Sequence, residues 1–173
     1  MKRAALILSI FIFAFSCDNN SKGSKPETDA QPPKDTVNMP AKDTIKWEEL
    51  VSGRECSVEK PANLFIISNT QLDSLWSAAF KGEERPDKPV VDFSKSSVIA
   101  LFTGTVKSGG HSIAVTSVQM NNGVIEITGE HKIPGKSCMS TTAVEFPYYL
   151  ALTDRPLKGT PTFSIKTKEY ECE

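Results

Sequence analysis

A strict two-residue alternation runs through Gly123-Val124-Ile125-Glu126-Ile127-Thr128-Gly129-Glu130-His131-Lys132-Ile133. Odd positions are mostly apolar or small, whereas Glu126, Thr128, Glu130 and Lys132 point the other way, so the stretch predicts a strand with one buried and one solvated face. Asn122-Gly123 can supply the two positive-φ residues of a tight hairpin turn. We therefore predict an antiparallel hairpin that joins this strand to Ser112–Met120.

A second strand, Val98–Phe102, is apolar at both parities, which is typical of a central strand covered on both faces. A helix is predicted from the apolar spacing between Leu72 and Phe80, with Thr70 and Asp73 as a capping pair and Gly82 at its end. Further strands are expected at 63–68, 143–146, 148–153 and 162–168. The predicted class is α+β, with one largely antiparallel β-sheet of about six to eight strands and one main helix packed on it.

The N-terminus has the order of a secretion signal: Lys2 and Arg3, an apolar run from Ala4 to Phe15, then Ser16 and Cys17. About twelve apolar residues fall short of the roughly twenty that span a bilayer. Ala14-Phe15-Ser16-Cys17 resembles the lipobox of bacterial lipoproteins. We expect residues 1–16 to be removed as a signal peptide and Cys17 to carry the lipid, so that the protein is anchored in the bacterial cell envelope, on a periplasmic or surface face.

Residues 17–44 contain four prolines, many polar residues and no aromatic residue. Such a composition cannot offset the entropy of ordering, so we predict a flexible tether. Residues 45–173 have the size of one domain. Loss of Lys2 and Arg3 from the 20 basic residues leaves 18 against 21 acidic ones, a net charge of −3, and no polybasic block occurs. This balance argues against nucleic acid as a partner.

Several short motifs occur at the spacing of a known family: Leu75-Trp76, 89–95, 108–113 and Phe146-Pro147-Tyr148. Together they resemble the C-terminal domain of the protease complex subunit PrcB family, over about residues 47 to 168. One departure is Ser108-Gly109-Gly110-His111, where the family pattern has Thr-Gly-Gly and an aromatic residue. The resemblance implies an extracytoplasmic accessory subunit or interaction module associated with proteases, and it brings no established catalytic residues.

The residues themselves carry little catalytic chemistry. Ser112 stands beside His111 on a predicted strand, where adjacent side chains point to opposite faces, so the two cannot act as nucleophile and base. A zinc site from His111, His131 and Cys138 lacks paired ligand spacing. His131 is interpreted as a hydrogen-bonded histidine at the edge of the core. We expect no catalytic residue, metal or cofactor.

Two segments are candidates for binding a protein partner. The first segment consists of Ser108, Gly109, Gly110 and an exposed His111. Its paired glycines either shape a tight turn or let another chain approach. In the second, Pro147 inside an apolar run predicts an edge strand or a bulge, with Tyr148 beside it. Strand edges can accept an extended peptide.

Three cysteines remain besides Cys17, and an oxidising compartment permits one disulfide among them. All three pairings are open, and the usual nearness of domain termini favours Cys56 with Cys172. There is no Cys-x-x-Cys motif for redox chemistry.

Three functions are compatible with these features. The first is a tethered, non-catalytic interaction module, such as a protease-associated subunit, which requires a free strand edge. The second is a protease inhibitor, which requires a rigid, protruding loop at 104–112. The third is a small envelope hydrolase, which requires a pocket that brings a nucleophile to a histidine.

Overall fold

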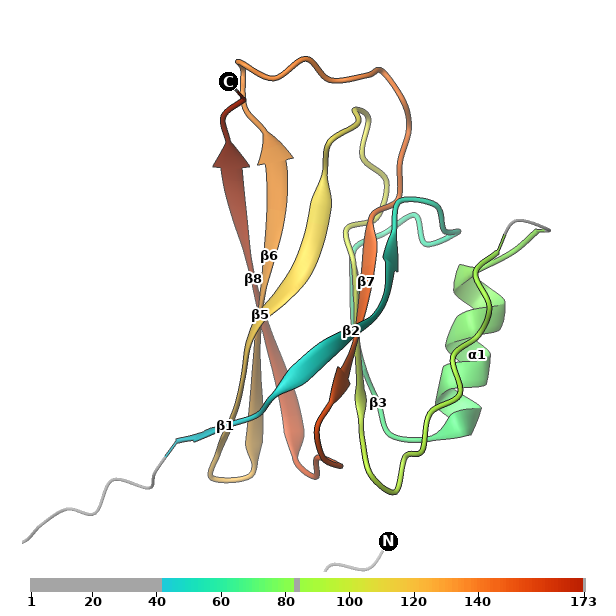
Figure 1. The fold of residues 1–173 in the computed structure, drawn as a ribbon, viewed down its shortest axis with the longest axis vertical. Helices are drawn as coiled ribbons and strands as arrows, with labels where there is room; N and C mark the ends of the chain where they lie inside the picture. The colour runs from blue at the N-terminus through green and yellow to red at the C-terminus, as the bar shows by residue number, and fades with distance from the viewer. Residues whose placement is uncertain (1–41, 83–84, 173) are drawn as a thin grey trace, which may run out of the picture. The chain divides into compact units, whose positions relative to one another are not determined.

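The computed structural model describes residues 42–82 and 85–172. The predicted signal peptide, Cys17 and all but the last three residues of the predicted tether lie outside these residues. The described part contains eight strands and one helix (Figure 1), in the order β1 (Asp43–Thr44), β2 (Trp47–Gly53), β3 (Ala62–Ile66), α1 (Asn69–Ala79), β4 (Val98–Phe102), β5 (Ser112–Asn121), β6 (Val124–Pro134), β7 (Tyr148–Thr153) and β8 (Thr160–Tyr170). The predicted α+β class is confirmed. Within the same residues, no helix is long and apolar enough to cross a membrane.

The strands form two four-stranded sheets instead of gathering in one. The inner sheet has the order β2-β7-β4-β3 and is antiparallel throughout. The outer sheet has the order β1-β5-β6-β8, and its β6–β8 pair is parallel. Because β4 and β7 are apolar on both faces, a single helix cannot cover them, and the outer sheet supplies the second cover.

The core therefore has two parts on opposite faces of the inner sheet. On one face, Val98, Ala100 and Phe102 of β4 pack in a cluster with the apolar side of α1. On the other face, Ile99 and Leu101 pack in a cluster with β5 and β6 of the outer sheet. Figure 1 shows the resulting three layers, with α1 on one side of the inner sheet and β5, β6 and β8 on the other. The predicted two-sided burial of β4 is confirmed.

The predicted hairpin is also confirmed. Asn121 of β5 pairs with Val124 of β6, and the two connecting residues have positive φ, 48° at Asn122 and 78° at Gly123. Both conformations match the right-handed twist of the strands that they join. Ile125, Ile127 and Gly129 are buried in alternation along β6, as the sequence pattern predicts.

The helix begins earlier than predicted, and the capping pair is a different one. Ser68 is the N-cap, and its side chain accepts a hydrogen bond from the Gln71 N–H, 3.3 Å away. The Gln71 side chain in turn accepts from the Ile67 N–H at 2.8 Å, so Ser68 and Gln71 satisfy two backbone donors at this end. The prediction of Thr70 with Asp73 is therefore wrong. The helix ends at Ala79, before Gly82.

The edge position predicted from Pro147 is wrong, because β7 lies between β2 and β4. Pro147 immediately precedes the strand, and its carbonyl accepts from the Thr103 N–H at 3.0 Å. At that position the missing N–H removes no bond from inside the ladder. Residues 143–146 do not form a strand either; a single bridge joins Glu145 to Val106.

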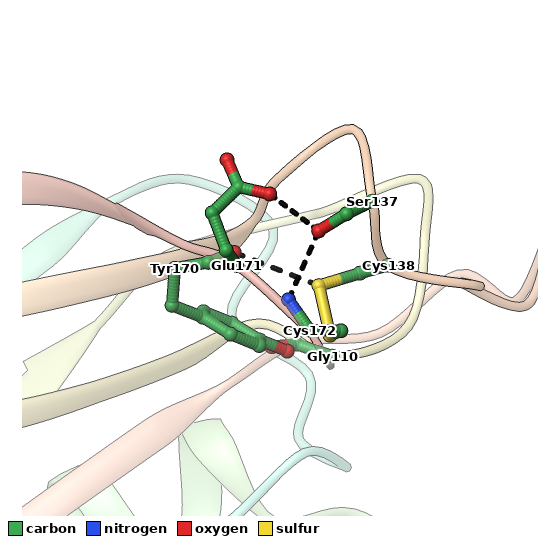
Figure 2. The surroundings of a disulfide bond; sticks show 6 residues. All are labelled: Gly110, Ser137, Cys138, Tyr170, Glu171 and Cys172. Atoms are coloured by element: carbon green, nitrogen blue, oxygen red, sulfur yellow. Dashed lines mark hydrogen bonds between the residues drawn. A yellow bond between two sulfur atoms is a disulfide. The ribbon is translucent and has the colours of Figure 1, made fainter.

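The predicted pairing of Cys56 with Cys172 is wrong, because Cys138 bonds to Cys172 (Figure 2), with their Cα atoms 4.9 Å apart. The parallel pairing of β6 with β8 brings the ends of both strands together, and the Gly135 N–H donates to the Tyr170 carbonyl at 2.8 Å. Cys138 lies shortly after the end of β6 and Cys172 shortly after the end of β8, so the two cysteines are brought close to each other. Cys56 lies instead in the helix-side cluster as a half-buried free thiol, and burial raises its pKa, although a backbone hydrogen bond at Val58 opposes that shift.

Candidate functional site

The glycine turn at residues 107–111 leads into the first residue of β5, and other segments hold it at both glycines. The Gly109 N–H donates to the Thr141 carbonyl at 3.0 Å, and a Cβ at Gly109 would collide with the Thr141 hydroxyl. Gly110 has a φ of 90°, and the Tyr170 hydroxyl donates to its carbonyl at 3.0 Å. Both predicted uses of glycine, close approach and positive φ, are thus found in one turn. The turn therefore packs against residues of two other segments, Thr141 and Tyr170.

The four predicted binding residues of this turn lie together, and a second histidine joins them. The Ser108 Oγ lies 3.0 Å from the His111 Nε2, and the His111 Nδ1 lies 3.1 Å from the His131 Nε2. His131 reaches this position because β5–β6 pairing sets it opposite Ile113, two residues after His111. His111 is half-buried and not exposed as predicted. The prediction that His131 is hydrogen-bonded and partly buried is confirmed.

The surroundings of both histidines favour the neutral imidazole. Burial lowers the pKa of His111, and the negative charge of Glu145 opposes this shift in part. Burial also lowers the pKa of His131, and a positive charge on His111 would lower it further. A neutral imidazole has one donor and one acceptor nitrogen, so Ser108, His111 and His131 can form a continuous series of hydrogen bonds.

Glu145 is a largely buried carboxylate beside this turn, with 16% of its side chain exposed. Its Oε1 lies 3.7 Å from the Arg54 Nη1, a long ion pair. Its Oε2 is buried without a hydrogen-bond partner among the described residues. The backbone of Glu145 is fixed by the bridge to Val106, which keeps the charge close to the turn.

The series from Ser108 to His131 has the connectivity of a nucleophile, a base and a residue that orients the base. The sequence analysis considered only Ser112 as a nucleophile beside His111. The signal for Ser108 was its spacing of three residues from His111 across a turn. An acyl-transfer site also needs free oxyanion donors and a pocket at the nucleophile. The Gly109 N–H is already bonded to Thr141, and the cleft that His111 lines does not include Ser108.

Metal binding gains no support from the described part of the chain. His111 and His131 do meet, but the Cys138 sulfur is bonded to Cys172 and cannot be the third ligand. Within residues 42–82 and 85–172, no cluster of three or more His, Cys, Asp or Glu side chains could hold a metal ion.

An open cleft of about 380 Å³ lies beside the turn, between β2 of the inner sheet and β5 of the outer sheet. His111 lines one part of it, together with Arg54 and Lys132, neither of which the sequence singled out. Tyr148 also lines the cleft, although it is only 6% exposed and packs against Phe80 with ring centroids 4.9 Å apart. Pro147 is buried. The second predicted binding segment therefore contributes mainly to the core.

These features define a three-layer α+β domain with a fixed glycine turn and a cleft between its sheets. Residues 97–154 match the family model described as PrcB C-terminal, which confirms the resemblance over β4 to β7 and the turn. The two ends of the matched region meet, because the Thr153 N–H donates to the Ser97 carbonyl at 2.9 Å. Proteins of the PrcB family are accessory subunits and not catalytic ones. No curated protein and no solved structure matches the chain.

Proposed function

We propose that the protein is a lipid-anchored envelope lipoprotein whose domain is a non-catalytic interaction module, an accessory subunit of a protease complex. The observation that carries this proposal is the PrcB C-terminal match over residues 97–154. The matched residues supply both central strands of the inner sheet, the β5–β6 hairpin and the glycine turn. They are therefore the framework on which the rest of the domain is built.

The structure favours a binding module over an inhibitor. An inhibitor of the loop-insertion type needs a protruding loop, but the turn packs against Thr141 and Tyr170. A sheet-edge binder needs an unpaired strand edge. Among the described residues, β1 pairs with only two residues of β5, so most of β5 has no neighbouring strand on the side away from β6. Backbone groups at such an edge can pair with an extended partner.

Affinity capture from membranes tests the protease-associated role. The full-length protein with a C-terminal affinity tag serves as bait, and residues 1–44 fused to an unrelated folded domain serve as the matched control. We expect a protease subunit to be enriched with the complete protein alone, because the control retains the proposed anchor and tether but lacks the domain. Equal recovery of every protease from both baits would contradict the proposal.

Substitution of Cys17 tests the lipid anchor separately. Lipid attachment requires the Cys17 thiol, so Cys17→Ser should remain unprocessed or appear in the soluble fraction. Metabolic labelling with an alkyne fatty acid measures acylation directly, and Cys56→Ser is the matched control. A Cys17→Ser protein that is still processed and acylated would exclude the lipoprotein assignment.

A small envelope hydrolase is the second candidate, favoured by the hydrogen-bonded series Ser108–His111–His131. A fluorophosphonate probe, which labels activated serines, distinguishes it from the binding module. Labelling that Ser108→Ala and His111→Ala abolish, and that Ser112→Ala leaves intact, would establish a nucleophilic serine. The binding-module proposal expects no labelling above that of Ser108→Ala.

A further inference from the structure

Two strand edges of this domain face each other without pairing. β1 pairs with Gln119 and Met120 of β5, and the Ile45 N–H donates to the Val118 carbonyl at 2.9 Å. The chain then leaves the outer sheet and continues as β2 at the edge of the inner sheet. In the described part of the chain, residues 112–117 of β5 therefore have no strand on this side.

The cleft beside the turn lies between these two edges. Its volume is about 380 Å³, and β2 and β5 both contribute to its lining, with Ser52 and Ser112 among the lining residues. Figure 1 shows the chain crossing from β1 at the outer sheet to β2 at the inner sheet. An unpaired stretch of six residues is about 20 Å long, which is enough to align a short extended peptide. The cleft thus occupies the position that β1 would take if it continued along β5.

One end of the cleft is basic. Arg54, Lys132 and Lys168 line a second hollow of about 430 Å³, which shares Arg54, Ser112 and Lys132 with the cleft. The side chains of Arg54 and Lys132 are 58% and 54% exposed, and each forms one long ion pair, Arg54 with Glu145 at 3.7 Å and Lys132 with Glu130 at 3.9 Å. Two carboxylates also line the cleft, Glu130 beside Lys132 and Glu49 from the earlier part of β2, whereas Lys168 adds a third cation at the end near Arg54. A free carboxylate would find complementary charge at the basic end.

The direction of β1 sets the direction of the proposed guest. β1 is antiparallel to β5, and its pairing advances from Met120 to Gln119, toward Ser112. A strand that continues this pairing reaches the Ser112 end of β5 with its C-terminus, where Arg54 and Lys132 stand. Charge and strand direction therefore select the same ligand, an extended segment that ends in a free carboxylate.

We propose that the extended C-terminal segment of a partner protein adds to β5 as an antiparallel strand in this cleft, with its terminal carboxylate at Arg54, Lys132 and Lys168. Backbone hydrogen bonds to residues 112–117 supply the pairing, and the basic end selects a free C-terminus. This proposal rests on the proposed function and specifies how the partner is held. The half-buried His111 lines the same cleft, which places the glycine turn next to the bound terminus.

A synthetic peptide of alternating threonine and valine, labelled at its N-terminus and ending in a free carboxylate, is the probe. Its fluorescence anisotropy is measured with the full-length protein in detergent, and the same peptide with a C-terminal amide is the control. We expect amidation to weaken binding several-fold and the double substitution Lys132→Glu/Lys168→Glu to weaken it by about tenfold. Lys158→Glu, between β7 and β8, is a single charge reversal outside the cleft and should leave affinity unchanged. Thermal unfolding verifies that each variant is folded.

Hydrogen exchange locates the bound peptide independently of charge. The free-carboxylate peptide should slow exchange of amides within residues 112–117. Absence of binding at about 1 mM peptide, equal affinity for the amide, or protection confined to β3 or β8 would each overturn the proposal. If Lys132→Glu/Lys168→Glu still captures the protease subunit, this mode of binding fails and the proposed function stands. If the peptide binds as expected but the intact protein captures no protease, the proposed function fails alone.

Discussion

Removal of the Cys138–Cys172 disulfide should destabilise the domain substantially. The bond joins residues 34 positions apart in the chain, so it closes a long loop in the unfolded state. The chain-entropy relation gives about 4 kcal/mol for a loop of this length, within the usual range of about 2–5 kcal/mol for a native disulfide. We therefore expect Cys138→Ala/Cys172→Ala to lose about 4 kcal/mol of unfolding free energy and about 10–20 °C in melting temperature.

Urea unfolding of the oxidised proteins measures this loss. Cys56→Ala is the matched control, because it removes a half-buried cysteine outside the disulfide and should cost only about 1 kcal/mol. Wild-type protein treated with reductant should approach the stability of the double variant, whereas the double variant should not respond to reductant. The loss should also loosen Tyr170, whose hydroxyl holds the Gly110 carbonyl.

Mass spectrometry of the unreduced protein decides the pairing itself. A peptide linking Cys138 to Cys172, with alkylation at Cys56, is the expected result. A linkage of Cys56 to Cys172 would refute the parallel arrangement of β6 and β8 that brings Cys138 and Cys172 together. A loss below about 1 kcal/mol in the double variant would refute the loop-closure argument.

Trp76→Ala should cost about 3–5 kcal/mol in urea unfolding, because Trp76 is 4% exposed and packs against Phe80; Ser77→Ala on the exposed side of α1 should stay within about 0.5 kcal/mol, and equal effects would contradict the packing of α1. Gly123→Ala should cost about 1–2 kcal/mol because φ is 78° there, as checked by thermal unfolding. The lowered pKa of His131 means that the folded protein binds fewer protons than the unfolded chain below about pH 6.5, so stability should fall as the pH drops from about 7 to 5.5. Urea midpoints across this range should fall less steeply for His131→Gln, and an unchanged slope would count against the shift.

Local pattern predicted the parts of this fold in which neighbouring residues make the decision. Asn122-Gly123 and the alternation after it specify the β5–β6 hairpin, because turn geometry and strand period act within a few residues. The apolar spacing of α1 specified its buried face in the same way. The prediction of the helix cap failed although capping is also a local feature, because Ser68 and Thr70 are both residue types that suit an N-cap. In the structure Ser68 forms the cap, and the Gln71 side chain accepts a hydrogen bond from the Ile67 N–H.

The class of the domain, its central strand, its hairpin and its helix could all be predicted from the sequence, because hydrophobic periodicity and turn-residue type act within a few neighbouring residues. Local pattern could not predict the division into two sheets, the Cys138–Cys172 bond, the contact of His111 with His131 or the cleft between β2 and β5. Each of these depends on pairing between segments far apart in the chain. The parallel pairing of β6 with β8 is an example. The two strands are not joined by a tight turn whose residues could be recognised, and their pairing is part of the outer sheet that covers the second face of β4.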